Sequence, residues 1–379
     1  MEEDSSSIYT MKLLILFTLG CLTSSSLGDD IPMPRFSWET FGKMAIFHSS
    51  NTTAPSGMYS PESIEILAKY AVVTIEKYQG NEGFFPHHKE INMKNCQDHE
   101  DVSQCGCCVE DNIEEVAQGI KAIDPSTMVF AYIHSQKAYP VYRGSQELAK
   151  HPDLWLRDAK GNIVHENPDE TYMLWDHANL ESGQFLLDDC VNMVNGGLID
   201  SCHLDGCTKI PHDAPDKDKY WEVKLDVMLD MQAKMKGPVI CGANGHIVEG
   251  LKATALQNWG KNPTWSTREM PMLFEAVNAG VMFEAHFECP EDPENQHTIN
   301  NIASFLIAAG PYSYFRCGGW SGYDPVWYPI YDYPIGEPLG NATLGDDGVW
   351  RRSFKSGTSV TFDTKHEKGT IDWATSFLD

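Results

Sequence analysis

Two acidic residues of this chain stand at or near the ends of short, mostly apolar runs. Asp205 closes the segment 197–205 and is followed at once by Gly206, and Glu284 stands in a second run, 279–286. In a parallel α/β barrel these positions would bring both carboxyl groups to the C-terminal mouth of the strands, where barrel enzymes keep their chemistry. Glycosidic bond cleavage needs two such groups, a proton donor and a nucleophile or base.

The flanking residues predict different pKa values for the two carboxyl groups. Glu284 lies within the sequence Val-Met-Phe-Glu-Ala, so burial should raise its pKa and keep it protonated as the general acid. Asp205 has more open and polar neighbours and is the candidate nucleophile. A separation of ~5 Å between the carboxyl groups would indicate retention of configuration, and ~6.5–9.5 Å would indicate inversion. A helix cap or turn is the structural alternative for Asp205.

Other side chains at strand ends and in loops are candidates for binding a sugar. Strand side chains alternate, so His203 should share a face with Asp205, and His286 with Glu284. Flat indole rings in loops stack on the C–H faces of sugars. The candidate substrate-binding residues are His48, Glu76, His134, His203, Trp259, His286 and Trp320.

Histidines at four strand ends also raise the alternative of a metal-dependent hydrolase or deacetylase. Such a site needs clustered ligands, usually a His-x-His pair on one strand. The first strand offers only His48, and the chain contains no His-Glu-x-x-His sequence. We therefore expect no metal and no other cofactor. A non-catalytic carbohydrate-binding barrel with an idle acid/base pair is the second alternative.

The elements that must position these residues alternate between short β-rich runs and helical patterns from about Phe36 to Tyr333. This alternation predicts a parallel sheet, with 152–164 as a hairpin excursion. Eight strands result if 172–175 belongs to the excursion, so that Asp205 closes the fourth strand and Glu284 lies on the seventh. We expect strands at 44–48, 71–75, 129–134, 201–205, 239–242, 254–259, 281–286 and 312–316.

The predicted fold class is α/β, a TIM (β/α)8 barrel with a small C-terminal antiparallel β-cap. Residues 1–28 resemble a secretory signal, with Met11 as an alternative start. The barrel then spans 29–335, with a cysteine-rich insertion at 90–110, and the cap spans 336–379. Short alternating runs predict the cap, which is too small to stand alone and should pack on the barrel.

The signal predicts a secreted protein, with a lysosome or another endomembrane lumen as alternatives. Its apolar core is shorter than the ~20 residues that a membrane span needs, so we expect no membrane association after cleavage; an uncleaved anchor is the alternative. Ten cysteines remain after the signal, an even number that favours disulfides, with zinc as the alternative for the insertion. Asn51 and Asn341 begin N-glycosylation sequences.

The amino-acid composition limits the kinds of molecule that the protein is expected to bind. The 379-residue chain carries 54 Asp and Glu against 28 Lys and Arg, a formal net charge of −26. Such a surface repels phosphate backbones and anionic lipids, so we expect no nucleic-acid partner. We expect a carbohydrate substrate, and the oligomeric state is left open.

Several motifs resemble those of secreted (β/α)8 glycosidases. The stretch 151–158 with Gly161, then Trp175-Asp176, and then 198–206 occur in the order found around the catalytic strand of those enzymes. The chain is similar to the families catalogued as hypothetical glycosyl hydrolases, and more distantly to polygalactosaminidase-like and α-galactosidase-like barrels. The tail 350–360 is similar to the short β-cap that often closes such barrels.

The resemblance covers about 36–373 and implies that Asp205 matches the aspartate after the catalytic strand. It suggests Glu284 as its partner. The chain departs from the pattern at Ser201, where the related motif has glycine, and the cysteine-rich insertion has no counterpart.

Overall fold

The computed structural model describes residues 31–49, 59–77, 109–139, 141–165, 172–262, 264–287, 295–317 and 325–374. Residues Ile31–Asp379 form one compact unit. The signal segment, the four cysteines of the predicted insertion, and Trp320 lie outside the described residues. The domain boundaries at 28 and 335 stay predictions.

Eight parallel strands form the barrel, as the sequence predicts. Neighbouring strands pair in the order β1-β2-β3-β6-β7-β8-β9-β10, and a parallel bridge between Ala45 and Phe315 links the first strand to the last. The strands are β1 (Ile46–Ser49), β2 (Val72–Ile75), β3 (Met128–His134), β6 (Ser201–Asp205), β7 (Ile240–Gly242), β8 (Ala253–Leu256), β9 (Met282–Phe287) and β10 (Ser313–Cys317).

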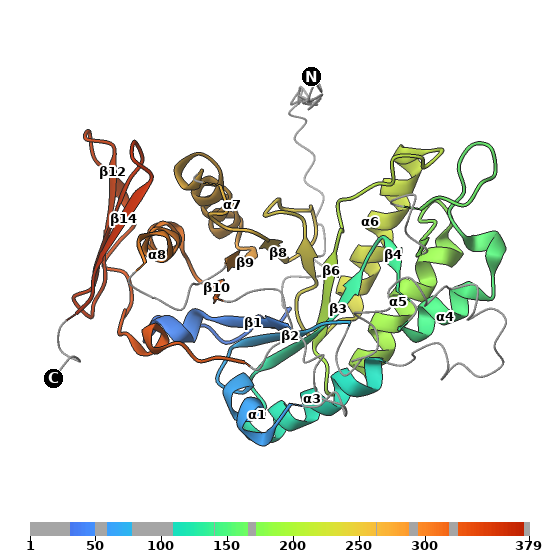
Figure 1. Cartoon of the computed structure of the whole chain (residues 1–379), viewed down its shortest axis with the longest axis horizontal. Helices are drawn as coiled ribbons and strands as arrows, with labels where there is room; N and C mark the ends of the chain where they lie inside the picture. The colour runs from blue at the N-terminus through green and yellow to red at the C-terminus, as the bar shows by residue number, and fades with distance from the viewer. Residues whose placement is uncertain are drawn as a thin grey trace, which may run out of the picture. The chain divides into compact units, whose positions relative to one another are not determined.

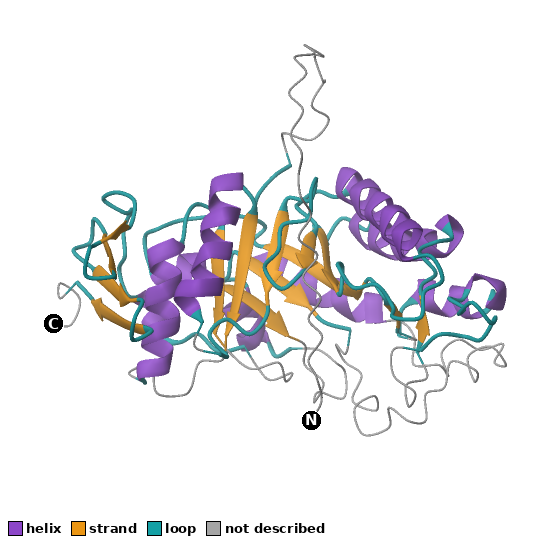
Figure 2. Ribbon diagram, turned by 90° about the horizontal axis from the view of Figure 1, so that it is seen from above, coloured by secondary structure: helices purple, strands orange, loops and turns teal. Residues whose placement is uncertain are grey.

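Helices flank these strands in the sequence and lie outside the sheet in space (Figures 1 and 2). Between β7 and β8, the loop 243–252 takes the place of a helix. The helices are α1 (Pro61–Leu67), α3 (Val109–Ile123), α4 (Arg143–Ala149), α5 (Leu180–Asn195), α6 (Lys217–Lys234), α7 (Met270–Ala279) and α8 (Gln296–Ala308). Short helical turns span Phe41–Met44, Pro152–Leu154, Trp265–Glu269 and Pro329–Asp332.

Capping side chains explain where several helices begin. Ser60, Asn179, Asp216 and Asn295 each accept a hydrogen bond from a backbone N–H two or three residues further on, at the starts of α1, α5, α6 and α8. These bonds satisfy amides that have no partner within the helix.

The predicted excursion and the predicted cap are both present. β4 (Lys137–Ala138) and β5 (Met173–Leu174) pair antiparallel outside the barrel, so the segment around 172–175 is not a barrel strand. The cap is an antiparallel sheet of β11 (Thr343–Leu344), β12 (Val349–Ser353), β13 (Ser359–Asp363) and β14 (Lys368–Asp372). The sheet packs on α8, where the Arg352 guanidinium donates to the carbonyl of Leu306 over 2.8 Å.

This topology settles where the two acidic residues stand. Asp205 is the last residue of β6, the fourth barrel strand, and Glu284 is the third of six residues in β9, the seventh. A buried apolar cluster that includes Ile46, Phe130 and Met282 lies on the same faces of the strands, nearer their N-terminal ends. Within the described residues, no helix combines the length and hydropathy that a membrane crossing requires.

Candidate active site

Polar side chains gather where β1, β2, β3, β6 and β9 end. The ring centroid of His48 lies 4.7 Å from that of His203 and 5.1 Å from that of His286. Nε2 of His48 lies 3.3 Å from Oε1 of Glu76, and Nδ1 of His203 lies 3.6 Å from Oε2 of Glu284. The structure therefore brings together residues on β1, β6 and β9 and the residue that follows β2, which are far apart in the sequence.

Asp205 is half-buried and firmly held. Its Oδ2 accepts a hydrogen bond of 2.7 Å from the Tyr132 hydroxyl, and its carbonyl accepts two from the backbone and the side chain of Ser135. Burial favours the neutral carboxyl, but His134, the Tyr132 bond and His203 outweigh it and hold the pKa of Asp205 below its ordinary value. Asp205 is therefore a carboxylate at neutral pH.

The turn after Asp205 is fixed by three further contacts. Gly206 has a φ of +64° and packs so closely on His134 that a Cβ would lie 2.9 Å from the imidazole ring, so both conformation and space favour glycine. The buried Nζ of Lys224 donates to the carbonyls of Gly206 and Lys209, each over 2.9 Å. A disulfide joins Cys207 to Cys241. These contacts hold the backbone next to Asp205 in one conformation, which keeps the carboxyl group in place.

Glu284 lies deeper than Asp205 and has no exposed surface. Its Oε2 is 3.0 Å from Nε2 of His286, the next residue on the same face of β9 towards the end of the strand. Burial raises the pKa of Glu284 to about 7, although the positive charge of Arg316 opposes the rise. Near neutral pH this carboxyl therefore exists in both its protonated and ionised forms.

Glu76, the third carboxyl of the group, is ionised. Burial alone would raise its pKa, but Lys77, with Nζ 3.0 Å from Oε2, and His48 hold it well below the usual value. A group with so low a pKa cannot store a proton near neutral pH. Glu76 is therefore no candidate for the general acid.

The histidines around these carboxyls are neutral. Burial lowers the pKa of His48 and of His203 to about 4 and that of His134 to about 3, and it lowers the pKa of His286 well below its usual value. Nδ1 of His134 accepts hydrogen bonds from the backbone N–H groups of Gln136 and Lys137. The proton of neutral His134 is therefore on Nε2.

Comparison with known families decides the identity of the chain. Residues 121–358 match hypothetical glycosyl hydrolase family 15. The chain belongs to this family. It is thus a glycosyl hydrolase, as the sequence motifs implied. A comparison with curated proteins found no match.

The solved structures to which this chain is similar include several glycosidases. A noncanonic maltogenic alpha-amylase from Thermotoga neapolitana is 11% identical, with 85% of this chain and 86% of that chain covered and a TM-score of 0.48. An alpha-N-acetylgalactosaminidase from Bifidobacterium bifidum is 12% identical, with 89% and 60% covered and a TM-score of 0.49. An alpha-amylase from Malbranchea cinnamomea is 9% identical, with 86% and 85% covered and a TM-score of 0.47.

Trp259, which was predicted to stack on a sugar, does not lie among the polar side chains at the strand ends. It is only 1% exposed and packs edge-on against Phe283 and Phe305, and its indole N–H donates to Ser304. Phe283 alternates with Glu284 and so faces away from the barrel interior. The indole fills the layer between the barrel and α8, which corrects the expectation.

Three polar residues of the group were not among the sequence candidates: Lys77, Tyr132 and Arg316. Tyr132 lies two residues before His134 on β3, and Lys77 directly follows Glu76. The alternation that pairs His203 with Asp205 applies equally to Tyr132 and His134 and could have identified the tyrosine. Arg316 lies on β10 and is 3% exposed.

A metal-dependent hydrolase would need several ligands close together. Among the described ranges, no three or more His, Cys, Asp or Glu side chains are arranged so that they could hold a metal ion.

Proposed function

We propose that this glycosyl hydrolase cleaves O-glycosidic bonds of a poly- or oligosaccharide, with Asp205 as the nucleophile and Glu284 as the source of the proton. One observation carries the proposal: the environments of the three gathered carboxyls push their pKa values apart. The pKa of Glu284 is raised to about 7, whereas those of Asp205 and Glu76 are lowered. Such a separation assigns acid and base roles in carboxylate enzymes.

Asp205 suits the attack on the anomeric carbon for two reasons. It is ionised, and it is the more exposed of the two proposed catalytic carboxyls. The fixed turn behind it lowers the entropy that must be lost when the reacting atoms meet.

In this proposal Glu284 acts through His286, because its carboxyl lies two residues deeper in β9 than the imidazole. His286 lies 3.0 Å away and nearer the strand end. As the glycosidic bond breaks, the proton of Glu284 passes to Nε2 of His286 while Nδ1 releases its own proton to the leaving oxygen. Glu284 ends as a carboxylate and His286 stays neutral. Water then attacks the anomeric carbon and breaks its bond to Asp205, which leaves as a carboxylate, and the proton that the water loses returns through His286 to Glu284.

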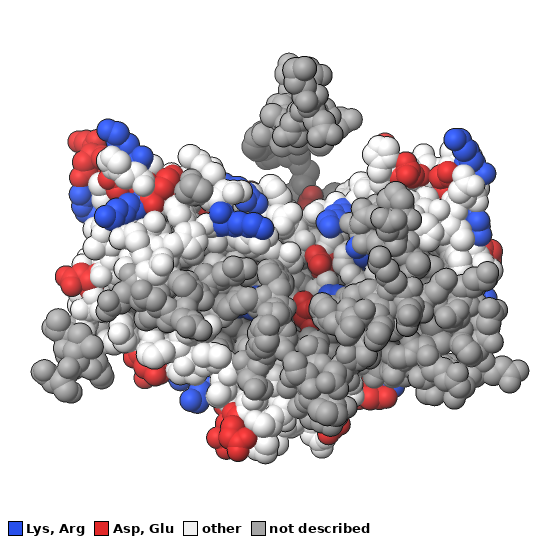
Figure 3. Space-filling view, viewed as in Figure 1, with Lys and Arg blue, Asp and Glu red and all other residues white. Residues whose placement is uncertain are grey.

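The family supports a carbohydrate substrate, and the pairing of opposite charges supports a neutral one. Over the C-terminal sheet in Figure 3, Lys and Arg side chains lie among Asp and Glu. In the barrel interior, the cation of Lys77 is paired with the carboxylate of Glu76. A neutral sugar, which is bound by hydrogen bonds and not by a counter-charge, fits such surroundings.

A glycan panel tests the proposal. Wild type should hydrolyse at least one glycan, whereas Asp205→Asn and Glu284→Gln should each lose nearly all activity at an unchanged melting temperature. Asp176→Asn is the matched control, because Asp176 is a partly buried carboxyl outside the group. Turnover by both variants at the wild-type rate would refute the assignment. Sugar binding without turnover by any form would favour a non-catalytic barrel.

We also propose that the protein is secreted. The disulfides Cys190–Cys202 and Cys207–Cys241 suit an oxidising compartment. Asn341, which begins a glycosylation sequence, is exposed just before β11. Expressed in insect cells, the protein should reach the medium, and Asn341→Gln should remove the mass of one glycan. Retention in the cytosol without glycan would contradict secretion.

A further inference from the structure

The hydroxyl of Tyr132 contacts Oδ2 of Asp205, and Gly242, which has no side chain, lies beside Oδ1. We propose that Tyr132 is a positioning residue that holds Oδ2 of Asp205, while Gly242 keeps the flank of Oδ1 clear for the substrate. This inference rests on the proposed role of Asp205 as the nucleophile. It adds two residues that act on the nucleophile without reacting themselves.

Tyr132 is held so that its hydroxyl can point only at Asp205. In the register of β3 and β6 it lies opposite His203, and the two rings stack with centroids 6.1 Å apart. Nζ of Lys77 lies 4.1 Å from the centre of the tyrosine ring. These contacts fix the ring, and the 2.7 Å bond then fixes the carboxylate.

Gly242 lies directly opposite Asp205 in the register of β6 and β7. A Cβ on Gly242 would lie 3.1 Å from the carbonyl oxygen of Leu204, 3.2 Å from Cα of Asp205 and 3.5 Å from its Oδ1. Any larger side chain would therefore cover the second carboxylate oxygen. The absence of a side chain at this position leaves room where a sugar ring must approach Oδ1.

The consequence is a carboxylate with two unequal oxygens. Oδ2 accepts a hydrogen bond and is less nucleophilic, whereas Oδ1 keeps its lone pairs for the anomeric carbon. A hydrogen bond to the charged form also lowers the pKa of a carboxyl. The other titratable groups that interact with Asp205 include His134 on β3, His203 on β6, His286 on β9, Lys77 after β2 and Lys224 on α6.

Tyr132→Phe isolates the hydroxyl, because the ring and both of its contacts remain. The pKa of Asp205 is read from the carboxyl ¹³C resonance that disappears in Asp205→Asn, which requires no substrate. We expect this pKa to rise in Tyr132→Phe and to stay unchanged in Tyr220→Phe. Tyr220 is the matched control, since its buried hydroxyl donates to the carbonyl of Trp175. An unchanged Asp205 pKa in Tyr132→Phe would overturn the proposal.

A measurement on the wild-type chain covers the case in which Tyr132→Phe does not fold. With ¹³C at every tyrosine Cζ, one resonance should shift with the same midpoint as the Asp205 carboxyl, and it should stop shifting in Asp205→Asn. Absence of such a resonance would contradict the hydrogen bond on which the inference depends.

Activity separates this inference from the proposed function. On the best 4-nitrophenyl glycoside of the panel, Tyr132→Phe should lower kcat on the order of tenfold to a hundredfold with little change in KM. Gly242→Ala should lower kcat as well, because its methyl group contacts Oδ1. If Asp205→Asn is inactive but Tyr132→Phe and Gly242→Ala turn over at the wild-type rate, the positioning roles are refuted and the role of Asp205 as nucleophile is upheld. If Asp205→Asn is active, the proposed function fails.

Discussion

Nε2 of His286 lies 3.0 Å from Oε2 of Glu284, and both side chains are almost completely buried inside the barrel. The imidazole is neutral because burial lowers its pKa, whereas burial raises the pKa of the carboxyl to about 7. The carboxyl of this pair therefore gains or loses a proton near neutral pH, while the imidazole keeps one N–H. In the proposed reaction the carboxyl proton moves to Nε2 of His286 and the Nδ1 proton passes to the leaving oxygen.

The pH dependence of activity should report this proton. Since Glu284 acts when protonated and its pKa is about 7, kcat/KM of the wild type should fall about tenfold for each pH unit above 7. Glu284→Gln should have low activity with no such decline. A basic limb near pH 7 that persists in Glu284→Gln would assign the limb to another group.

Buried neutral histidines should make the fold sensitive to acid. Burial lowers the pKa of His177 to about 3 from the usual 6.5, so between these values the unfolded chain takes up a proton that the folded chain does not. Stability should fall as the pH decreases through this window, by about 1.4 kcal/mol per pH unit for each such histidine. Urea unfolding between pH 4.5 and 6 should show a shallower slope for His177→Gln. The exposed His212 provides the control substitution, His212→Gln.

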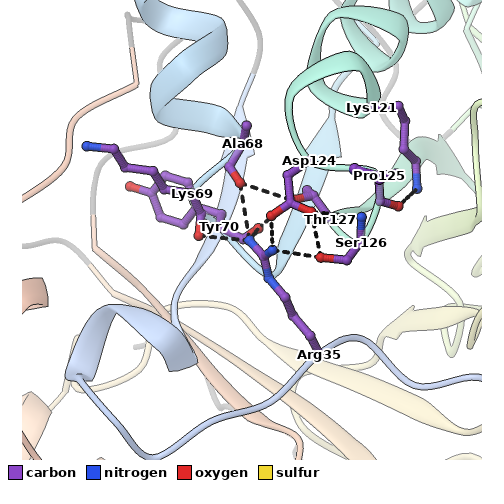
Figure 4. Close-up of polar contacts among 9 residues, drawn as sticks. All are labelled: Arg35, Ala68, Lys69, Tyr70, Lys121, Asp124, Pro125, Ser126 and Thr127. Atoms are coloured by element: carbon purple, nitrogen blue, oxygen red, sulfur yellow. Dashed lines mark hydrogen bonds and ion pairs between the residues drawn. The ribbon is translucent and has the colours of Figure 1, made fainter.

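Arg35 ties the N-terminal segment to the loops before β2 and β3 (Figure 4). Its guanidinium pairs with Asp124 and donates to the carbonyls of Lys69 and Tyr70 over 3.0 and 2.7 Å. Arg35→Met should cost about 1–3 kcal/mol of unfolding free energy, the lower end being favoured because the side chain is one-third exposed. Denaturant unfolding measures the loss. We expect kcat at saturating substrate to stay unchanged, and a fall in kcat would show that Arg35→Met also disturbs the catalytic residues.

The two described disulfides should differ in their effect on activity. Cys207–Cys241 closes a separation of 34 residues and Cys190–Cys202 one of 12, so each should stabilise the fold by about 3–4 kcal/mol through chain entropy. Only the first lies in the turn that carries Asp205. Replacing both cysteines of that pair by serine should lower kcat as well as the melting temperature. The Cys190/Cys202 double serine variant should lose stability alone, and equal losses of kcat would contradict the distinction.

The sequence was sufficient to predict most of the fold, because each barrel strand is a short apolar run between helical patterns. The predicted strand 201–205 coincides with β6. The end of β9 was harder to predict, because Glu284 and His286 interrupt its apolar pattern. The strand continues to Phe287. For this reason the sequence did not reveal how deep Glu284 lies.

Side-chain surroundings were harder to predict than strands. An indole near a strand end can stack on a sugar or fill the space beneath a helix, and only the packing of α8 shows that Trp259 does the second. Tyr132 was missed because a tyrosine in an apolar strand is usually part of the core. The bond to Asp205 depends on a partner 73 residues away, which no local pattern shows.

The division of labour between the two carboxyls can be tested with leaving groups of different basicity. A 2,4-dinitrophenyl glycoside of the preferred sugar needs no protonation when it departs, whereas an alkyl glycoside does. We expect Glu284→Gln to recover most of the wild-type rate on the dinitrophenyl substrate and to fail on the alkyl one, while Asp205→Asn fails on both. Recovery by Asp205→Asn, or equal failure of Glu284→Gln on both substrates, would contradict the account.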